Sequence, residues 1–191
     1  MLLIFYKLFE KVRMFPLYLT YINHNRYLKI HYKTAYNYTD LQRIQILISF
    51  HKTLNNKFAI LCIFFFFKQL FEKNGYFIIL NKKNNKILGM KFYLTKSLMY
   101  KYLNFLIINF FNQPEIQNKL TLNSFDTMYN YSFTIANTYS YYLEKLVKNP
   151  IYKTILNEFD IKTTFIFSKI HEVNLYNNIF YLNFFKLYFN V

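Results

Sequence analysis

The sequence predicts an α+β fold, in which helices pack on one face of an antiparallel or mixed sheet. Three observations predict it. Some segments alternate between apolar and polar side chains, as strands do; others are amphipathic and end in residues that terminate helices; and the order of the segments keeps helices and strands apart. The 191 residues are 54% hydrophobic, which suits one domain with a sizeable core. We expect this domain to cover residues 26–191, behind an N-terminal extension of residues 1–25.

The N-terminal part of the predicted domain holds a strand and a helix. Residues 27–36 alternate between apolar and basic side chains, which predicts a strand with one basic face. Thr39 and Gln42 then have the spacing of a capping box, an arrangement that satisfies backbone N–H groups at the start of a helix. The helix that they open would bury Leu41, Ile44 and Ile48.

The middle of the chain predicts two helices and a hairpin. The apolar run at 58–73 predicts a buried helix, with a buried strand as the alternative, and Gly75 suits the left-handed residue that follows many helices. Residues 76–80 and 87–94 predict two strands joined as a hairpin by a short loop. Residues 96–111 carry apolar side chains along one stripe, which predicts another helix.

The C-terminal part predicts three strands and a last helix. The strands fall near residues 120–126, 130–136 and 160–167. The helix covers residues 171–188, and Ser168 is placed to cap its N-terminus. Its apolar face would hold Val173, Tyr176, Phe180 and Leu187.

The charge of the chain predicts a polyanionic partner. Its 24 lysines and arginines outnumber the 9 acidic residues, which gives a net charge of +15. Nucleic acid and an anionic membrane surface both fit this charge. No apolar run reaches the ~18 residues that a membrane-spanning helix needs, so we expect no membrane span.

The residue types that support catalysis are sparse. With only 2 glycines, the chain cannot form a glycine-rich loop that cradles phosphate. Its 4 histidines and its single cysteine, Cys62, do not have the spacing of metal ligands. We therefore expect no enzyme activity, no metal, no cofactor and no disulfide within the chain.

The segment from Ser124 to Phe133 resembles the signature Ser-Phe-Asp-Gly-x-Gly-Asn-Tyr-Ser of the bacterial-type ribosomal protein L-five family. The matching positions are Ser124, Phe125, Asp126, Asn130, Tyr131 and Ser132. Three other landmarks stand in the order of that family, and one is the predicted helix at residues 100–111, which sits where the family has its long helix. Residues 88–94, Leu-Gly-Met-Lys-Phe-Tyr-Leu, resemble its Ile-Gly-x-Lys-Val-Thr-Leu strand, and residues 159–164, Phe-Asp-Ile-Lys-Thr-Thr, resemble its Leu-Asp-Ile-x-x-x-Thr strand.

This resemblance implies a structural constituent of the large ribosomal subunit, located in the central protuberance. The partners that it implies are large-subunit rRNA, with 5S rRNA among it, neighbouring large-subunit proteins, and a small-subunit protein across an intersubunit bridge. The 20 tyrosines and 24 phenylalanines have AT-rich codons, a bias typical of organelle genomes. We expect a mitochondrial matrix protein encoded in such a genome; the alternative is a small membrane-associated subunit of a mitochondrial complex.

Several family positions are changed in this chain. Thr127 and Tyr129 stand where the signature has glycines, so we expect that the turn cannot freely use a positive φ. Lys33, Tyr76 and Tyr93 stand where the family places short polar residues against 5S rRNA. These replacements predict that 5S rRNA is absent or is held in an altered way.

The expected RNA-binding residues form three groups. On the basic sheet face, cations would neutralise phosphates and aromatic rings would stack on bases, with an ordinary solvated face as the alternative. The hairpin loop is shorter than in the family, so we expect it not to reach peptidyl-site tRNA. The signature turn either contacts RNA or only orders the backbone. The residues are Lys29, His31, Lys33, Lys91 and Tyr93 on the face, Lys82, Lys83 and Lys86 in the loop, and Asn130, Tyr131 and Ser132 in the turn.

Overall fold

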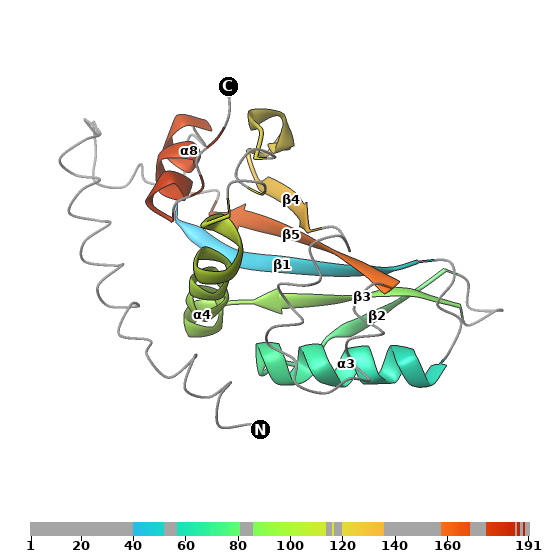
Figure 1. The fold of residues 1–191 in the computed structure, drawn as a ribbon. Helices are drawn as coiled ribbons and strands as arrows, with labels where there is room; N and C mark the ends of the chain where they lie inside the picture. The colour runs from blue at the N-terminus through green and yellow to red at the C-terminus, as the bar shows by residue number, and fades with distance from the viewer. Residues whose placement is uncertain are drawn as a thin grey trace. The chain divides into compact units, whose positions relative to one another are not determined.

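The computed structural model describes a large part of the chain and confirms an α+β fold (Figure 1). The described residues are 40–51, 57–80, 86–113, 116, 120–135, 158–168, 175–185, 187 and 189. The predicted extension at 1–25 and the predicted strand at 27–36 lie outside them.

The described strands form one five-stranded sheet in the order β2-β3-β1-β5-β4. They are β1 (Leu41–Phe50), β2 (Tyr76–Ile79), β3 (Ile87–Leu94), β4 (Tyr131–Ile135) and β5 (Phe159–Phe167). Both β1 and β2 pair with β3 in antiparallel register. The N–H of Ser168 donates to the carbonyl of Asp40, and the N–H of His51 donates to that of Glu158. Opposite ends of β1 and β5 therefore meet, so this pair is antiparallel as well.

The described part of the chain also contains three α-helices, which are α3 (Lys57–Phe71), α4 (Lys96–Leu106) and α8 (Leu175–Phe184). A π-helical turn, η1 (Ile107–Phe111), extends α4, and a 3-10 turn, η2 (Leu122–Ser124), precedes β4. These bounds confirm the helices expected at 58–73 and 96–111. A helix also lies in the segment expected to be helical at 171–188, but it ends at Phe184, and its described part starts at Leu175. The bounds also confirm the strands expected at 76–80, 87–94, 130–136 and 160–167.

The helix expected from the capping-box spacing is wrong, because this segment forms β1. Leu41, Ile44 and Ile48 are buried as expected, but Ile46, which would lie off the stripe of a helix, is buried too. The isoleucines alternate with more exposed residues, which is the period of a strand. Isoleucine is also stiff at χ1 and packs well on a pleated surface, so residue type and period both favour β1.

The C-terminal end of α3 differs from the expected one. Glu72, and not Gly75, adopts the left-handed conformation, with a φ of 51°. Gly75 instead lies against the ring of Phe92, and a Cβ at this position would be 2.6 Å from that ring. The glycine is therefore required for close packing and not for its backbone freedom.

Residues 120–126 do not form the expected strand. The turn η2 occupies the middle of the segment, and an isolated bridge joins Phe125 to Tyr131. Serine, asparagine and aspartate are frequent here, and these residues hydrogen-bond to nearby backbone and favour turns. The segment therefore leads into β4 as a series of turns.

The described part of α8 starts at Leu175, so the capping role expected of Ser168 involves residues outside the described part. The Ser168 hydroxyl accepts the backbone N–H of Asp40 at 3.0 Å. The expected apolar face of α8 is partly wrong, because Tyr176 is 78% exposed. Phe180 is half-buried and Leu187 is buried, while Val173 lies outside the described residues.

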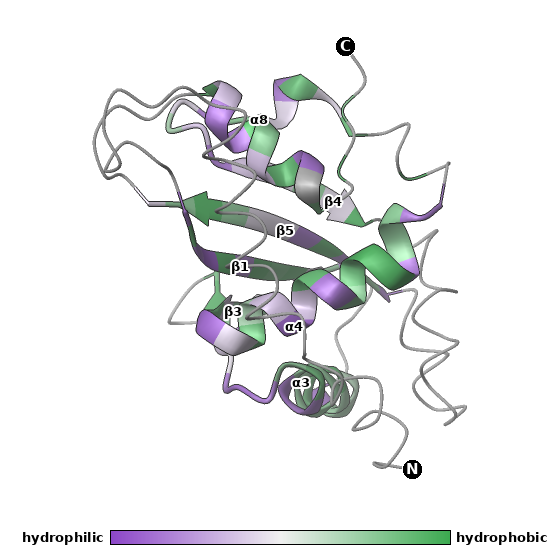
Figure 2. Ribbon diagram, turned by 90° about the vertical axis from the view of Figure 1, so that its left-hand side faces the viewer, coloured by the Kyte–Doolittle hydropathy of each residue, from purple (hydrophilic) through white to green (hydrophobic). Residues whose placement is uncertain are grey.

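The chain divides into two compact units, and each has its own aromatic core. Unit one comprises residues 1–43, 95–131 and 165–191, and unit two comprises residues 44–94 and 132–164. The core of unit one includes Tyr131 with the rings of Phe125, Phe165 and Phe189. The core of unit two includes Phe67 of α3 with the rings of Phe71, Phe92 and Phe159. Figure 2 shows the hydrophobic residues of the strands and of α3 in green.

Candidate nucleic-acid interface

One face of the sheet in unit two carries two of the residues predicted to bind RNA. In β1, Ile46 is completely buried, so the residues on either side of it lie on the other face of the sheet. Gln45 stands opposite Tyr93, and Leu47 stands opposite Lys91, in the register with β3. Directly opposed side chains share a face, so all four lie together. We call this face the open face.

The open face continues onto β5 and β4. The ring of Phe159 packs on Phe67 of α3, as does the ring of Phe92, so these two rings lie on the buried face. Side chains alternate along β5, which places Lys162 and Thr164 on the open face. The hydroxyl of Ser132 in β4 lies 3.0 Å from that of Thr164, so Ser132 belongs to this face as well.

Two tyrosines and a lysine form a cluster on the open face. Tyr76 stands opposite Lys91 in the register, and the rings of Tyr76 and Tyr93 meet edge-on, with centroids 6.5 Å apart and planes at 61°. The Lys91 Nζ lies 4.9 Å from the centroid of the Tyr93 ring, within the range of a cation–π interaction. Tyr76 is 67% exposed, so the cluster offers a cation beside an accessible aromatic surface.

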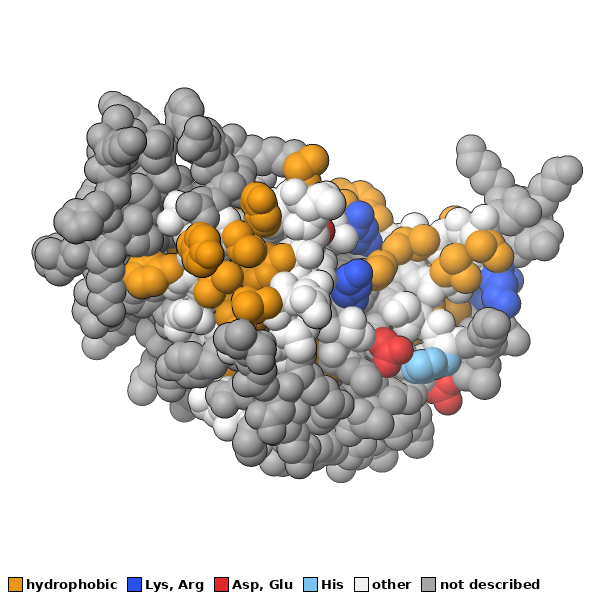
Figure 3. All heavy atoms as spheres, turned by 90° about the horizontal axis from the view of Figure 1, so that it is seen from above, with side chains coloured by type: hydrophobic (Ala, Val, Ile, Leu, Met, Phe, Trp, Pro, Cys, Tyr) orange, Lys and Arg blue, Asp and Glu red, His pale blue; other side chains and the backbone are white. Residues whose placement is uncertain are grey.

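An acidic group lies on the same face of the sheet, on β5. The Nε2 of His51 lies 3.8 Å from Asp160 Oδ1, and both side chains are about one-third exposed, at 38% and 32%. Figure 3 shows a histidine in pale blue beside acidic side chains in red, with basic side chains in blue on the same side of the molecule. Charge on the open face is therefore mixed, and its cations include Lys91 and Lys162.

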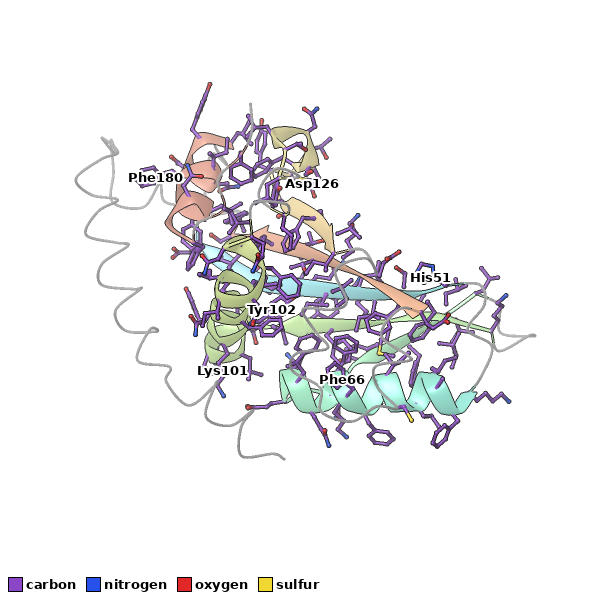
Figure 4. The ribbon with its side chains drawn as sticks, viewed as in Figure 1. His51, Phe66, Lys101, Tyr102, Asp126 and Phe180 are labelled. Atoms are coloured by element: carbon purple, nitrogen blue, oxygen red, sulfur yellow. The ribbon has the colours of Figure 1, made fainter. Side chains whose placement is uncertain are left out.

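The signature turn is held by the carboxylate of Asp126 (Figure 4). Its Oδ1 accepts the backbone N–H groups of Met128 at 2.9 Å and Asn130 at 2.8 Å, and its Oδ2 accepts the Asn130 side-chain amide at 2.9 Å. The Oδ1 of Asn130 in turn accepts the N–H of Phe167 at 3.2 Å. Asp126 and Asn130 therefore order the turn and connect it to β5.

Tyr129 adopts the positive φ that we expected to be hindered in this turn. Its φ is 56°, at one of the two positions where the family signature has glycine. The turn is closed by a hydrogen bond from the N–H of Tyr129 to the carbonyl of Asp126, at 2.9 Å. A left-handed conformation costs a residue other than glycine about 1–2 kcal/mol, so hydrogen bonds around Tyr129 offset this strain.

Tyr131 is completely buried in unit one, so its ring forms part of the core and does not lie on a surface that RNA could contact. Burial raises the pKa of Tyr131 to about 12, and interactions with the Ser124 side chain and the Thr121 backbone partly oppose this rise. Of the signature residues predicted to bind RNA, only Ser132 lies on the open face.

Six predicted RNA-binding residues remain, and only Lys86 among them lies in the described part of the chain. Lys86 is exposed at the start of β3, where its carbonyl accepts the N–H of Leu80 at 3.0 Å. Lys29, His31, Lys33, Lys82 and Lys83 lie outside the described residues. The sequence prediction missed Gln45, Leu47, Ser49 and Lys162 on the open face. The alternation of the isoleucines in β1 was the signal that could have revealed the first three.

Within the described residues, no group of three or more histidine, cysteine, aspartate and glutamate side chains could hold a metal ion. The same part of the chain contains no helix that is long and apolar enough to cross a membrane. Neither a protein-family model nor a curated protein matches this sequence.

Proposed function

We propose that this chain binds RNA through the open face and is a structural constituent of the mitochondrial large ribosomal subunit. The cluster of Tyr76, Lys91 and Tyr93 carries the proposal, because it combines a cation with aromatic rings in a chain whose net charge is +15. The resemblance to the ribosomal protein L-five family supports the same function. The family's proteins bind rRNA. They contain the signature and a strand that resembles the one holding Lys91 and Tyr93 in this chain.

The work of such a face is architectural. Lys91 and Lys162 neutralise phosphates and release the counterions that phosphates hold in solution. Tyr76 and Tyr93 offer ring surfaces on which an unpaired base stacks, an interaction worth about 1–3 kcal/mol per base. Gln45 and Ser49 add hydrogen-bonding groups beside them. This combination favours RNA with unpaired nucleotides over a regular duplex, whose bases are already stacked.

Tyr76 and Tyr93 affect which RNA the open face can bind. Short polar residues in the family become Tyr76 and Tyr93 here, and at Tyr93 a phenol does not fit where a small hydroxyl met a base. We therefore propose that 5S rRNA is absent from this ribosome or sits differently against the open face. The third replaced position, Lys33, lies outside the described residues, so the argument rests on these two rings.

Sedimentation of mitochondrial lysate tests the proposed function. The protein should travel with the large subunit and should be released by high salt, because its attachment to RNA is electrostatic. Recovery in a membrane complex that needs detergent, together with absence from ribosomes, would contradict the proposal and favour the membrane-associated alternative. Sequencing of small RNAs from the same fraction then decides whether 5S rRNA is present.

A further inference from the structure

Among the described strands, β2 lies at an edge of the sheet, in unit two. β2 is the first strand in the sheet order and pairs with β3. Natural edge strands are usually blunted by lysine, proline or inward-pointing charge, because their outer backbone groups can pair with another chain. The four residues of β2, Tyr-Phe-Ile-Ile, include none of these residue types, although the strand is short and its pairing with β3 has an irregularity between Ile78 and Ile79, two features that also limit edge pairing. Ile79 is 50% exposed, and Leu80 directly after the strand is also exposed.

The neighbouring helix α3 has an apolar stripe on its exposed side. Phe58, Leu61 and Phe65 are spaced three and four residues apart, so they lie on one side of the helix. All three are exposed, and Phe65 is 52% exposed. The opposite side of α3 buries a second apolar stripe against the sheet of unit two. A helix that is apolar on both sides is normally covered on both.

Aromatic contacts join the helix stripe to the sheet edge. The ring of Phe64 stacks on that of Phe77 in β2, with centroids 4.9 Å apart and planes at 30°. It also meets Phe65 edge-on, with centroids 5.9 Å apart. Leu61, Phe64, Phe65, Phe77 and Ile79 therefore form one apolar surface, which we call the edge surface. Contiguous exposed apolar area of this kind marks interaction sites.

We infer that the edge surface binds an extended acidic segment of another protein, which adds to β2 as a further strand. Strand addition satisfies the outer backbone groups of β2, and apolar side chains of the added segment cover Phe65 and Phe77. The acidic character follows from the lysines around the surface, which outnumber its one acidic residue, Glu72. These lysines are Lys57, Lys68, Lys73 and Lys86.

Other occupants fit the edge surface less well. A second copy of the chain also carries a charge of +15, so two copies repel each other. Lipid cannot hydrogen-bond to the outer backbone groups of β2. RNA needs cations and polar groups at the centre of a site, and here they lie at the rim. The inferred partner is therefore a protein segment, and its binding is independent of RNA binding at the open face.

A peptide of alternating valine and glutamate provides the probe, and its valine–lysine counterpart provides the control for charge. With the full-length chain, the glutamate peptide should bind in fluorescence anisotropy and slow hydrogen exchange at the amides of β2. Ile79→Lys, which adds the edge lysine found in natural sheets, should weaken binding at least about tenfold. Phe65→Ser should weaken it as well, without changing β2.

Ile108→Lys is the matched control variant, because Ile108 is 48% exposed and lies in η1, away from β2 in the sequence. It should leave binding unchanged. Equal binding of the lysine peptide, or equal loss in Ile108→Lys, would overturn the inference. So would protection of the β2 amides by self-association, by anionic vesicles or by RNA in place of the peptide.

Discussion

The buried side-chain amide of Asn178 in α8 donates a hydrogen bond of 2.9 Å to the carbonyl oxygen of Tyr129. It joins residues 49 positions apart in the sequence and meets the one residue of the signature turn that has a positive φ. The turn therefore keeps a left-handed conformation without the glycine that usually provides it. This relationship explains how the turn holds a left-handed residue although it contains no glycine.

Tyr129→Gly should stabilise the protein. Glycine adopts the φ of 56° without the steric cost that tyrosine has, although it also loses more backbone freedom on folding. We expect the free energy of unfolding to rise by about 0.5–1 kcal/mol in urea denaturation. Thr127→Gly is the control, because among the described residues the positive φ of this turn belongs to Tyr129. If both variants change stability equally, the strain at Tyr129 is not the cause.

Gly89→Ala should destabilise unit two. A Cβ on Gly89 would collide with the backbone carbonyl oxygen of Ile48 in the neighbouring strand β1. Because a backbone carbonyl in a sheet cannot move aside cheaply, we expect a loss of about 1–3 kcal/mol. The residue opposite Gly89 is the exposed Ser49, so Ser49→Ala tests the same strand pair without the collision. If Gly89→Ala unfolds at the same denaturant concentration as the wild type, Gly89 does not lie as close to the Ile48 carbonyl oxygen as described.

The stability of the protein should fall at high pH because of Tyr131. Its pKa is raised from 10.0 to about 12 in the folded state, so the unfolded state loses this proton first as the pH rises. The contribution is fully present below pH 10 and declines by about 1.4 kcal/mol per pH unit until the folded pKa is reached. Tyr131→Phe should remove this part of the decline, and the difference between the two denaturation profiles measures it. Parallel profiles for both proteins would show that Tyr131 titrates alike in the folded and unfolded states.

Much of the fold follows from local patterns, and the exceptions have identifiable causes. The hairpin of β2 and β3, the helix α4 and the strand β5 were predicted because alternation or a helical stripe was clear in each. β1 was missed because Leu41, Ile44 and Ile48 fit the apolar stripe of a helix. Ile46 lies two residues from both Ile44 and Ile48, and this alternation is the spacing that identifies a strand. Long-range contacts leave no local signal, so the hydrogen bond between the Ser168 hydroxyl and the Asp40 backbone N–H could not be predicted.

The candidate site was predicted in part. Lys91 and Tyr93 were assigned to one face from the alternation in β3, and the register with β1 confirms that they share it. Their neighbours Gln45 and Leu47 could not be found while β1 was taken for a helix. Tyr131 was a candidate either for an RNA contact or for ordering the turn because it belongs to the signature, and sequence alone does not distinguish a buried tyrosine from an exposed one.

RNA binding by the variant Lys91→Glu plus Lys162→Glu tests the central claim most directly. The measurement is the affinity of the full-length chain for large-subunit rRNA over a range of salt concentrations. We predict weaker binding and a log–log salt slope that is smaller by about 0.7–0.9 for each lost phosphate contact. The control is Lys57→Glu plus Lys68→Glu, which changes the net charge equally on α3 and should keep the wild-type slope. An unchanged slope for the open-face variant, or an equal reduction in the control, would contradict RNA binding at the open face.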